Sequence, residues 1–316
     1  MRETIIFVKK YTLSLSKLQS LYDSDQRVQD LYNQFKAGRN HVNINGIHGS
    51  LLSLVSSSLF KKLNKPFLFL FEDKEEAAYY LNDLENLLGD ESVLFYPGSY
   101  RRPYQIEEVD NANVLLRSEV LNRINSQKKP SCIISYPDAL FEKVITKKSL
   151  EKNTLKIKVG EELSLDFVNE VLFEYQFNRV DFVSQAGEFA VRGGIIDVFS
   201  YAYDKPFRVE FFGDEIDSIR AFDIETQLSS DRVKELKIMP NVENKHLEEK
   251  RESLLQYLSS ETIIVNKNTG RLTDRLDKLY SKAELAFEDL SQELKHAEPS
   301  DLFCDGLLIK GQIQKF

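Results

Sequence analysis

The feature that most constrains the fold is an alternation, in the first half of the chain, of short apolar runs with longer amphipathic segments. The apolar runs at residues 42–45, 67–71, 93–96 and 132–135 have the length of strands. The segments between and before them, at residues 13–35, 50–63, 73–88 and 107–124, have apolar residues near helical spacing. Strands that alternate with helices predict a parallel sheet with helices on its faces.

The pattern changes after about residue 145. Short strands are expected at residues 155–159, 178–184, 189–192 and 194–199, with one helix near residues 165–175. Apolar and polar residues alternate in residues 207–212. Residues 207–212 and 215–222 flank Gly213 and Asp214, a pair that is typical of a hairpin turn. Alternation of apolar and polar residues indicates a sheet with one face covered and the other exposed. We therefore predict a second, mostly antiparallel α+β unit.

The last part of the chain has helix-like segments around a short strand. Helices are expected at residues 247–259 and 271–295, a strand at residues 262–266, and a further strand segment with irregular flanks within residues 301–313. A chain of 316 residues is too long for one ordinary domain, and its 42% of hydrophobic residues can supply a core for each of several. The predicted units are residues 1–145, 146–239 and 240–316.

Composition excludes several classes of function. The net charge of −8 makes the chain a poor general ligand for phosphate backbones, although a local basic patch remains compatible with it. The two cysteines, Cys132 and Cys304, are far apart and have no metal-ligand spacing, so we expect neither a disulfide nor a metal site. The absence of a leader and of any apolar run of about 20 residues favours the cytoplasm and no membrane contact.

A glycine-containing loop at residues 46–53 follows a predicted strand and opens a helix, which is the setting of a phosphate-binding loop. A working loop needs a lysine for the terminal phosphates and a serine or threonine for Mg²⁺. Leucine stands at the lysine position and at the position before it, so we expect a tight turn that does not hydrolyse ATP. The residues of this degenerate loop are Gly46, Gly49, Ser50, Leu51, Leu52 and Ser53.

Five strings together resemble the UvrB-like N-terminal region of bacterial transcription-repair coupling factors. The two long strings are specific, and their order and spacing match the family. The strings are GIHGS at 46–50, YPDAL at 136–140, GEFAVRGGIIDVF at 187–199, RVEFFGDEIDSIR at 208–220 and FDIETQ at 222–227. The resemblance implies three domains like 1A, 2 and 1B of the excision-repair protein UvrB. These would be a degenerate P-loop NTPase-like α/β domain, an inserted α+β domain and a smaller α/β domain.

The resemblance also implies a function. In that family this region lacks ATPase activity, and its second domain binds UvrA. Full-length members add an RNA-polymerase-binding domain and a DNA translocase that uses ATP and Mg²⁺, so we expect this chain to be a fragment of a longer protein. It would need no cofactor, and it would meet RNA polymerase and DNA only through the other domains. Its UvrA-binding surface is expected to be masked by the C-terminal domain of the full-length protein.

The alternative is UvrB itself, a nucleotide- and DNA-binding component of excision repair. UvrB keeps the lysine of its phosphate loop and has a long, tyrosine-rich hairpin after the third strand. Here the corresponding stretch, residues 96–104, runs into a helix within about ten residues and leaves no room for such a hairpin. Both differences favour the coupling factor.

The expected UvrA contacts follow from the motifs. Arg179 and Arg192 match two arginines of UvrB-like domains, and Phe199 is a plausible apolar neighbour, whereas Ala190 replaces a further arginine. Arginine pairs with carboxylates through two parallel hydrogen bonds and is frequent, with aromatic residues, at the energetic centre of interfaces. Two alternatives remain open. Arg192 could pair with Glu188 or Asp197 within the sheet, and Phe199 could pack in the core.

Overall fold

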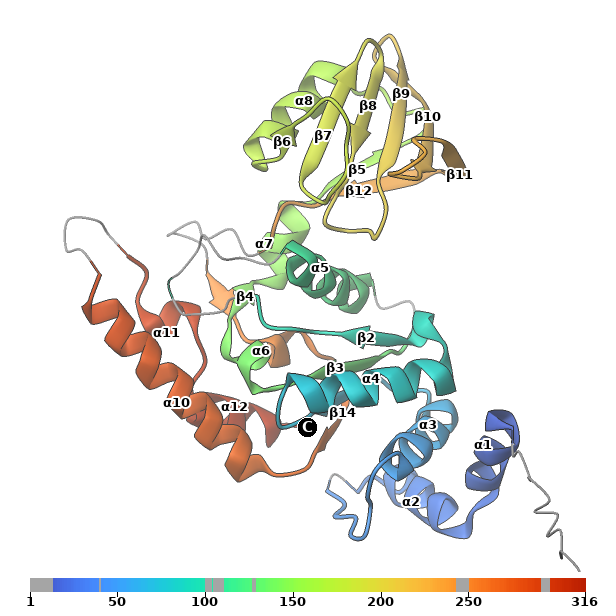
Figure 1. Cartoon of the computed structure of the whole chain (residues 1–316), viewed down its shortest axis with the longest axis vertical. Coiled ribbons are helices and arrows are strands. Elements are labelled where there is room, and N and C mark those ends of the chain that lie inside the picture. Colours follow the sequence, from blue (N-terminus) through green and yellow to red (C-terminus); the bar gives the residue numbers. More distant parts are fainter. Residues whose placement is uncertain are drawn as a thin grey trace, which may run out of the picture.

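The computed structural model describes residues 14–39, 41–99, 104, 111–126, 129–242, 250–290 and 296–316. The chain forms a unit built on a parallel sheet and a second unit built on a six-stranded sheet, which lies above the first in Figure 1. The combination of a parallel and an antiparallel α/β architecture confirms the predicted fold class at this level.

The first sheet has four parallel strands in the order β14-β1-β3-β2. Phe67 of β1 is paired with Cys132 on one side and Ile263 on the other. All residues of β1 and β3 are buried, as expected of strands covered on both faces. The bounds are β1 Phe67–Leu70, β2 Val93–Phe95, β3 Cys132–Ser135 and β14 Ile263–Asn266.

The helices of the first half follow the predicted spacing with one exception. Asp73 caps α4 by accepting the backbone N–H of Glu76 at 2.8 Å. The single helix predicted at residues 13–35 is wrong, because Asp25 is extended and caps a second helix through the N–H of Arg27. The bounds are α1 Leu15–Ser24, α2 Gln26–Lys36, α3 Leu51–Leu63, α4 Lys74–Leu88, α5 Asn111–Ser126, α6 Pro137–Phe141 and the 3₁₀ turn η1 Asp90–Ser92.

The strand predicted at residues 42–45 is also wrong. Residues 41–50 are all described, and none of them belongs to a strand. Val42 and Ile44 alternate with asparagines, and Ile44 is 47% exposed, so this segment lacks the continuous apolar character of a parallel strand. The glycine loop therefore follows an irregular segment, and the fourth strand of the sheet comes from the C-terminal part of the chain.

The C-terminal segment joins the first unit. Strand β14 pairs with β1, and helix α10 packs against α6, so residues predicted as a third unit share a sheet with the first. The predicted strand within residues 301–313 is wrong, because Asp305 caps a helix there by accepting the N–H of Leu308 at 2.7 Å. The bounds are β13 Arg251–Glu252, α9 Leu254–Tyr257, α10 Thr269–Glu288, α11 Pro299–Leu302 and α12 Gly306–Ile313.

Parts of four predicted helices lie outside the described residues: residue 13 of the first, residues 107–110 of another, residues 247–249 of a third, and residues 291–295 of the long C-terminal helix. The stretch at residues 96–104, expected to leave no room for a hairpin, is described only for residues 96–99 and 104. None of the helices that the structure describes is long and apolar enough to cross a membrane.

The second sheet has the order β11-β10-β9-β8-β7-β6, with only the β6–β7 pair parallel. The predicted turn at Gly213 and Asp214 joins β9 and β10, and this hairpin is confirmed. The strand predicted at residues 178–184 is limited to two residues. The bounds are β6 Asn178–Arg179, β7 Glu188–Arg192, β8 Ile195–Val198, β9 Phe207–Phe212, β10 Glu215–Phe222 and β11 Ser229–Val233.

The second unit is an insertion whose two ends meet. Its first strand, β5 Leu155–Lys158, pairs antiparallel with its last, β12 Glu235–Ile238. Strand β4 Val144–Ile145 pairs with β13 just outside the insertion, and α7 Lys147–Lys152 leads into it. Helix α8 Leu165–Glu174 covers one face of the six-stranded sheet, where the rings of Phe173 and Phe189 meet at 5.2 Å.

Candidate protein-binding surface

The face of the six-stranded sheet opposite α8 carries charged side chains. Strand pairing places Asp197 beside Arg208, Arg208 beside Arg220, and Arg220 beside Arg232 on this face. Arg192 lies two residues beyond Ala190, the partner of Asp197 in the neighbouring strand, and so shares the face. With Glu188 and Glu210, the face has four arginines and three carboxylates, so it keeps an excess of positive charge in a chain of net charge −8.

Asp197 is the buried centre of this face. Its carboxylate accepts hydrogen bonds from Arg208 Nε at 2.7 Å and from the second Arg208 nitrogen at 2.9 Å, and it forms an ion pair with Arg192. A buried carboxylate requires such partners because it has lost its hydration. The hydrogen bonds that Arg208 donates to Asp197 also raise the pKa of Arg208. One of the two pairings considered for Arg192, that with Asp197, is therefore present.

Arg192 nevertheless remains available to a partner. Its side chain is 42% exposed, and a guanidinium has five N–H donors, of which Asp197 uses only part. Its guanidinium carbon also lies 5.2 Å from the centre of the Phe182 ring, and Phe182 is 64% exposed. Sequence reasoning missed Phe182, because it assigned residues 178–184 to a strand in which an aromatic residue needs no special explanation.

Glu188 was the other pairing considered for Arg192, but its carboxylate holds a turn instead. It accepts the backbone N–H of Ser184 at 2.8 Å and that of Gln185 at 3.1 Å, and also their side chains. Burial raises the pKa of Glu188, but these hydrogen bonds outweigh it and leave the pKa below its usual value. The turn at residues 184–187, which follows Phe182, is thereby held against β7.

The structure brings only some of the predicted contact residues to one edge of the sheet. Arg179 lies exposed on the edge strand β6, in register with Phe189, and therefore on the α8 side of the sheet. Arg192 lies on the neighbouring strand and on the opposite face. Phe199 is only 6% exposed, so the structure favours core packing over the predicted surface contact for this residue. Ala190, where a further arginine was expected, is buried as well.

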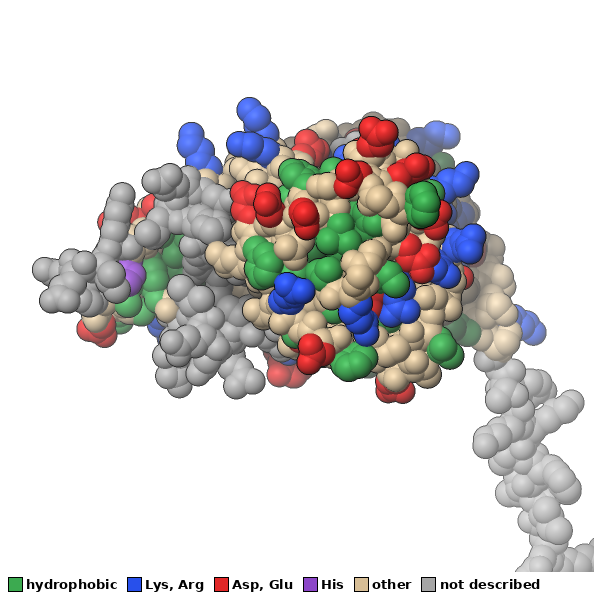
Figure 2. Space-filling view, turned by 90° about the horizontal axis from the view of Figure 1, so that it is seen from above, with side chains coloured by type: hydrophobic (Ala, Val, Ile, Leu, Met, Phe, Trp, Pro, Cys, Tyr) green, Lys and Arg blue, Asp and Glu red, His purple; other side chains and the backbone are tan. Residues whose placement is uncertain are grey.

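The end of the second unit that points away from the first unit has a mixed surface. Figure 2 shows hydrophobic side chains gathered near its centre, with acidic and basic side chains around them. Protein interfaces commonly combine an apolar centre with a polar rim. The large exposed apolar residues of the second unit are Val159, Phe167, Phe173, Phe182, Phe212, Ile224 and Leu228.

The glycine loop is engaged in contacts with α4. Gly46 and Gly49 have positive φ angles of 77° and 55°, as tight turns require. The hydroxyl of Ser50 is hydrogen-bonded to Tyr79 at 2.7 Å, and that of Ser53 donates to Asp83 at 3.0 Å. The side chain of Leu52, at the lysine position, is buried in the core. The hydroxyls that a phosphate or Mg²⁺ would need are thus directed to other side chains.

The carboxyl ends of β1, β3 and β14 are the edge at which α/β sheets bind ligands. A cavity of about 130 Å³ lies there, and ion pairs line it. Arg271 pairs with Glu72 at 2.8 Å, and Lys267 pairs with Glu76. Arg275, which also lines the cavity, pairs with Asp138 at 2.6 Å. Each cation that could attract a phosphate here already has a carboxylate.

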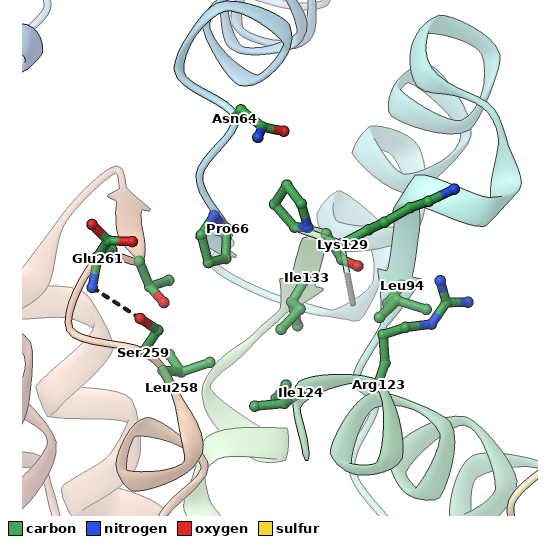
Figure 3. A pocket seen from close by; sticks show the side chains of 13 residues that line it. Asn64, Pro66, Leu94, Arg123, Ile124, Lys129, Ile133, Leu258, Ser259 and Glu261 are labelled. Atoms are coloured by element: carbon green, nitrogen blue, oxygen red, sulfur yellow. Dashed lines mark hydrogen bonds between the residues drawn. The ribbon is translucent and has the colours of Figure 1, made fainter. Parts of the chain in front are cut away.

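A larger cavity of about 230 Å³ opens at the amino ends of the same strands (Figure 3). Its walls include Leu94, Ile124, Ile133 and Leu258, and the buried hydroxyls of Ser131 and Thr262 give it a polar corner. Within the described ranges, no group of histidine, cysteine, aspartate and glutamate side chains has the arrangement of a metal site. Among the described residues that line this cavity, Glu261 is the one carboxylate, so no pair of carboxylates is brought together here.

Comparison with known proteins points to one family. Residues 155–243 match the UvrB interaction domain. The chain is 28% identical over 288 residues to a transcription-repair-coupling factor of Bacillus subtilis, covering 90% of this chain and 23% of that protein. It is 30% identical over 252 residues to the factor of Myxococcus xanthus, covering 78% of this chain and 21% of that protein. These matches confirm the predicted resemblance, and the chain spans less than a quarter of these relatives' length.

Proposed function

We propose that this chain, which is similar to the N-terminal region of transcription-repair coupling factors, is a non-catalytic protein-binding module. Its second unit would bind UvrA in the cytoplasm and recruit it to RNA polymerase stalled at a DNA lesion. The observation that carries the proposal is the exposed guanidinium of Arg192, 42% exposed beside Phe182, within the stretch that matches the UvrB interaction domain.

The side chains on β6 and β7, at one edge of the six-stranded sheet, suit an acidic partner. Arg179 and Arg192 offer planar donors that pair with carboxylates through two hydrogen bonds, which gives geometric specificity as well as attraction. The locally basic sheet face beside Arg192 would also speed the encounter with a negatively charged surface.

We further propose that the first unit is a P-loop-like scaffold that has lost nucleotide binding. The buried Leu52, the engaged hydroxyls of Ser50 and Ser53, and the paired Lys267 support this assignment. The chain would then act without a cofactor. ATP, Mg²⁺, DNA and RNA polymerase would be contacted by other domains of the longer protein.

The proposal is tested by measuring the affinity for UvrA of the Arg179→Glu and Arg192→Glu variants. Each is expected to weaken binding by about tenfold or more, because charge reversal replaces an attraction with a repulsion worth about 1.4 kcal/mol or more. Lys278→Glu, a charge reversal at an exposed position of α10 in the first unit, is the matched control. Unchanged affinity in both arginine variants would reject this site.

We also propose that the C-terminal domain of the full-length protein covers the same surface. This chain should then bind UvrA more tightly than the full-length protein does, because no masking domain must be displaced first. A side-by-side titration measures the difference. Equal affinities would argue against masking without affecting the proposed site.

A further inference from the structure

We propose that Phe182 and Arg192 act together as one preformed anchor for an acidic side chain that lies beside an apolar one on the partner. This inference rests on the proposed function and extends it to a residue that the motif comparison did not provide. It starts from Phe182, whose ring is 64% exposed and lies against the Arg192 guanidinium.

The guanidinium of Arg192 is held on two sides. Asp197 pairs with it from below the sheet surface, and the Phe182 ring lies 5.2 Å from its central carbon. A side chain that is already oriented loses less conformational freedom on binding than one that is mobile. Its exposed side can therefore receive a carboxylate at low entropic cost.

The backbone that carries Phe182 is fixed at both ends. Before it, the N–H of Val180 donates to the carbonyl of Phe189 at 2.9 Å. After it, Val183 is buried and Glu188 binds the N–H groups of Ser184 and Gln185. The ring is thus presented to solvent from a segment whose two ends are held, so less conformational freedom is lost when a partner binds it.

The local charge selects an acidic partner. Asp197 is shared by Arg192 and Arg208, so two guanidinium groups face a single carboxylate. The positive charge that remains is suited to one further carboxylate, while the Phe182 ring is suited to an apolar neighbour of that carboxylate.

The test compares Phe182→Ala with Phe212→Ala for binding to UvrA. Phe212 is a matched control, because it is 83% exposed at the hairpin tip of the same unit and lies outside the anchor. We expect Phe182→Ala to weaken affinity by about fivefold or more, mainly through faster dissociation, and Phe212→Ala to change it less than about twofold. Unchanged thermal unfolding of both variants confirms that the fold is intact.

A double-mutant cycle tests whether the two residues act as a unit. Phe182→Ala combined with Arg192→Ala should lose less affinity than the sum of the two single losses. Arg192→Lys, which keeps the charge but not the planar stacking, should behave like Phe182→Ala. Additive losses, or a Phe182→Ala variant that binds like the wild type, would overturn the anchor. If the variants Arg179→Glu and Arg192→Glu still bound weakly, the proposed function would stand without it.

Two outcomes identify a different occupant or reject both ideas. A self-association that Phe182→Ala abolishes, with UvrA binding unchanged, would assign the anchor to a second copy of this chain and overturn the proposal. Unchanged UvrA affinity in all arginine and phenylalanine variants would reject the anchor together with the proposed function.

Discussion

Two buried carboxylates of the second unit have different partners and therefore different roles. Asp197 is paired with the side chains of Arg192 and Arg208, so it orients a charged surface. Glu188 accepts hydrogen bonds from the turn at residues 184–187, so it orients the backbone. The difference arises because Asp197 lies in the middle of the sheet, whereas Glu188 lies at the start of β7 beside a loop.

The Glu188 carboxylate should make stability depend on pH. Its pKa in the folded protein lies below the usual 4.5, so it stabilises the fold above that pH and this contribution is lost as the pH falls through the folded value. Glu188→Gln should cost on the order of 1 kcal/mol near neutral pH and less near pH 3. Urea unfolding at both pH values measures it, with the exposed Glu174→Gln as control. A cost that does not change with pH would contradict the assignment.

Gly187 should be less tolerant of a side chain than another glycine with a similar backbone. Gly187 and Gly160 have φ angles of 87° and 80°, so alanine is strained at both by roughly 1–2 kcal/mol. A Cβ at Gly187 would also lie 2.5 Å from the hydroxyl oxygen of the buried Tyr201, whereas Gly160 has nothing within 4 Å. Gly187→Ala should therefore lose about 1–3 kcal/mol more than Gly160→Ala in chemical denaturation. Equal losses would show that Tyr201 moves aside.

At the scale of elements, a buried ion pair holds the segment that follows β2. Arg117 of α5 lies 3.3 Å from Glu142, and both side chains are buried. Arg117 also donates to the carbonyl of Pro97 at 2.8 Å, and Glu142 accepts the N–H of Ser99 at 2.9 Å. Helix α5, the segment after β2 and the end of α6 are thereby joined by one polar network inside an apolar core.

Removing one member of this pair should be strongly destabilising. Arg117→Met removes the guanidinium that pairs with the buried Glu142 carboxylate and is expected to cost about 3–5 kcal/mol in the free energy of unfolding. Adding Glu142→Gln should recover part of that loss, because glutamine still accepts the N–H of Ser99 without a charge. Guanidinium unfolding of the single and double variants measures both. A loss below about 1 kcal/mol for Arg117→Met would show that the pair contributes little.

At the scale of the whole molecule, the two units divide charge and contact between them. The first unit directs its cations at the carboxyl edge of the sheet to carboxylates, as Arg271 does with Glu72 and Arg275 with Asp138. In the second unit, two guanidinium groups, those of Arg192 and Arg208, share the single carboxylate of Asp197, and Arg179 lies exposed on the edge strand. The carboxyl edge of the first sheet thus has its cations matched one to one by carboxylates, whereas the guanidinium groups around Asp197 outnumber it.

This division predicts that ATP does not bind. Millimolar ATP with Mg²⁺ should leave the thermal midpoint where MgCl₂ alone leaves it, because a ligand stabilises a fold only to the extent that it binds the folded state. Differential scanning fluorimetry provides the measurement. A rise of the midpoint that depends on ATP concentration would show that the loop at residues 46–53 binds nucleotide despite Leu52.

The sequence alone was sufficient for elements that depend on local patterns. Helix α4 and the β9–β10 hairpin follow from helical spacing with a cap at Asp73, and from the turn at Gly213 and Asp214. The errors arose where distant segments compete. Residues 42–45 have too few apolar side chains to form a buried strand of the sheet. The strand that pairs with β1 on that side is β14, from the C-terminal part of the chain. The apolar residues within 301–313 fit a strand or a helix equally, and the cap at Asp305 selects the helix.

The chain's local chemistry thus determined the kinds of element, the hairpin turn, the absence of a lysine from the glycine loop, and the motifs that contain Arg179 and Arg192. Only the tertiary structure decided that Phe199 is buried, that Phe182 is exposed beside Arg192, and that Asp197 and Glu188 bind different partners. The reason is that spacing and turn chemistry act over a few residues. Exposure and ion pairing depend on which strands lie side by side, and that is settled by packing between segments far apart in the chain.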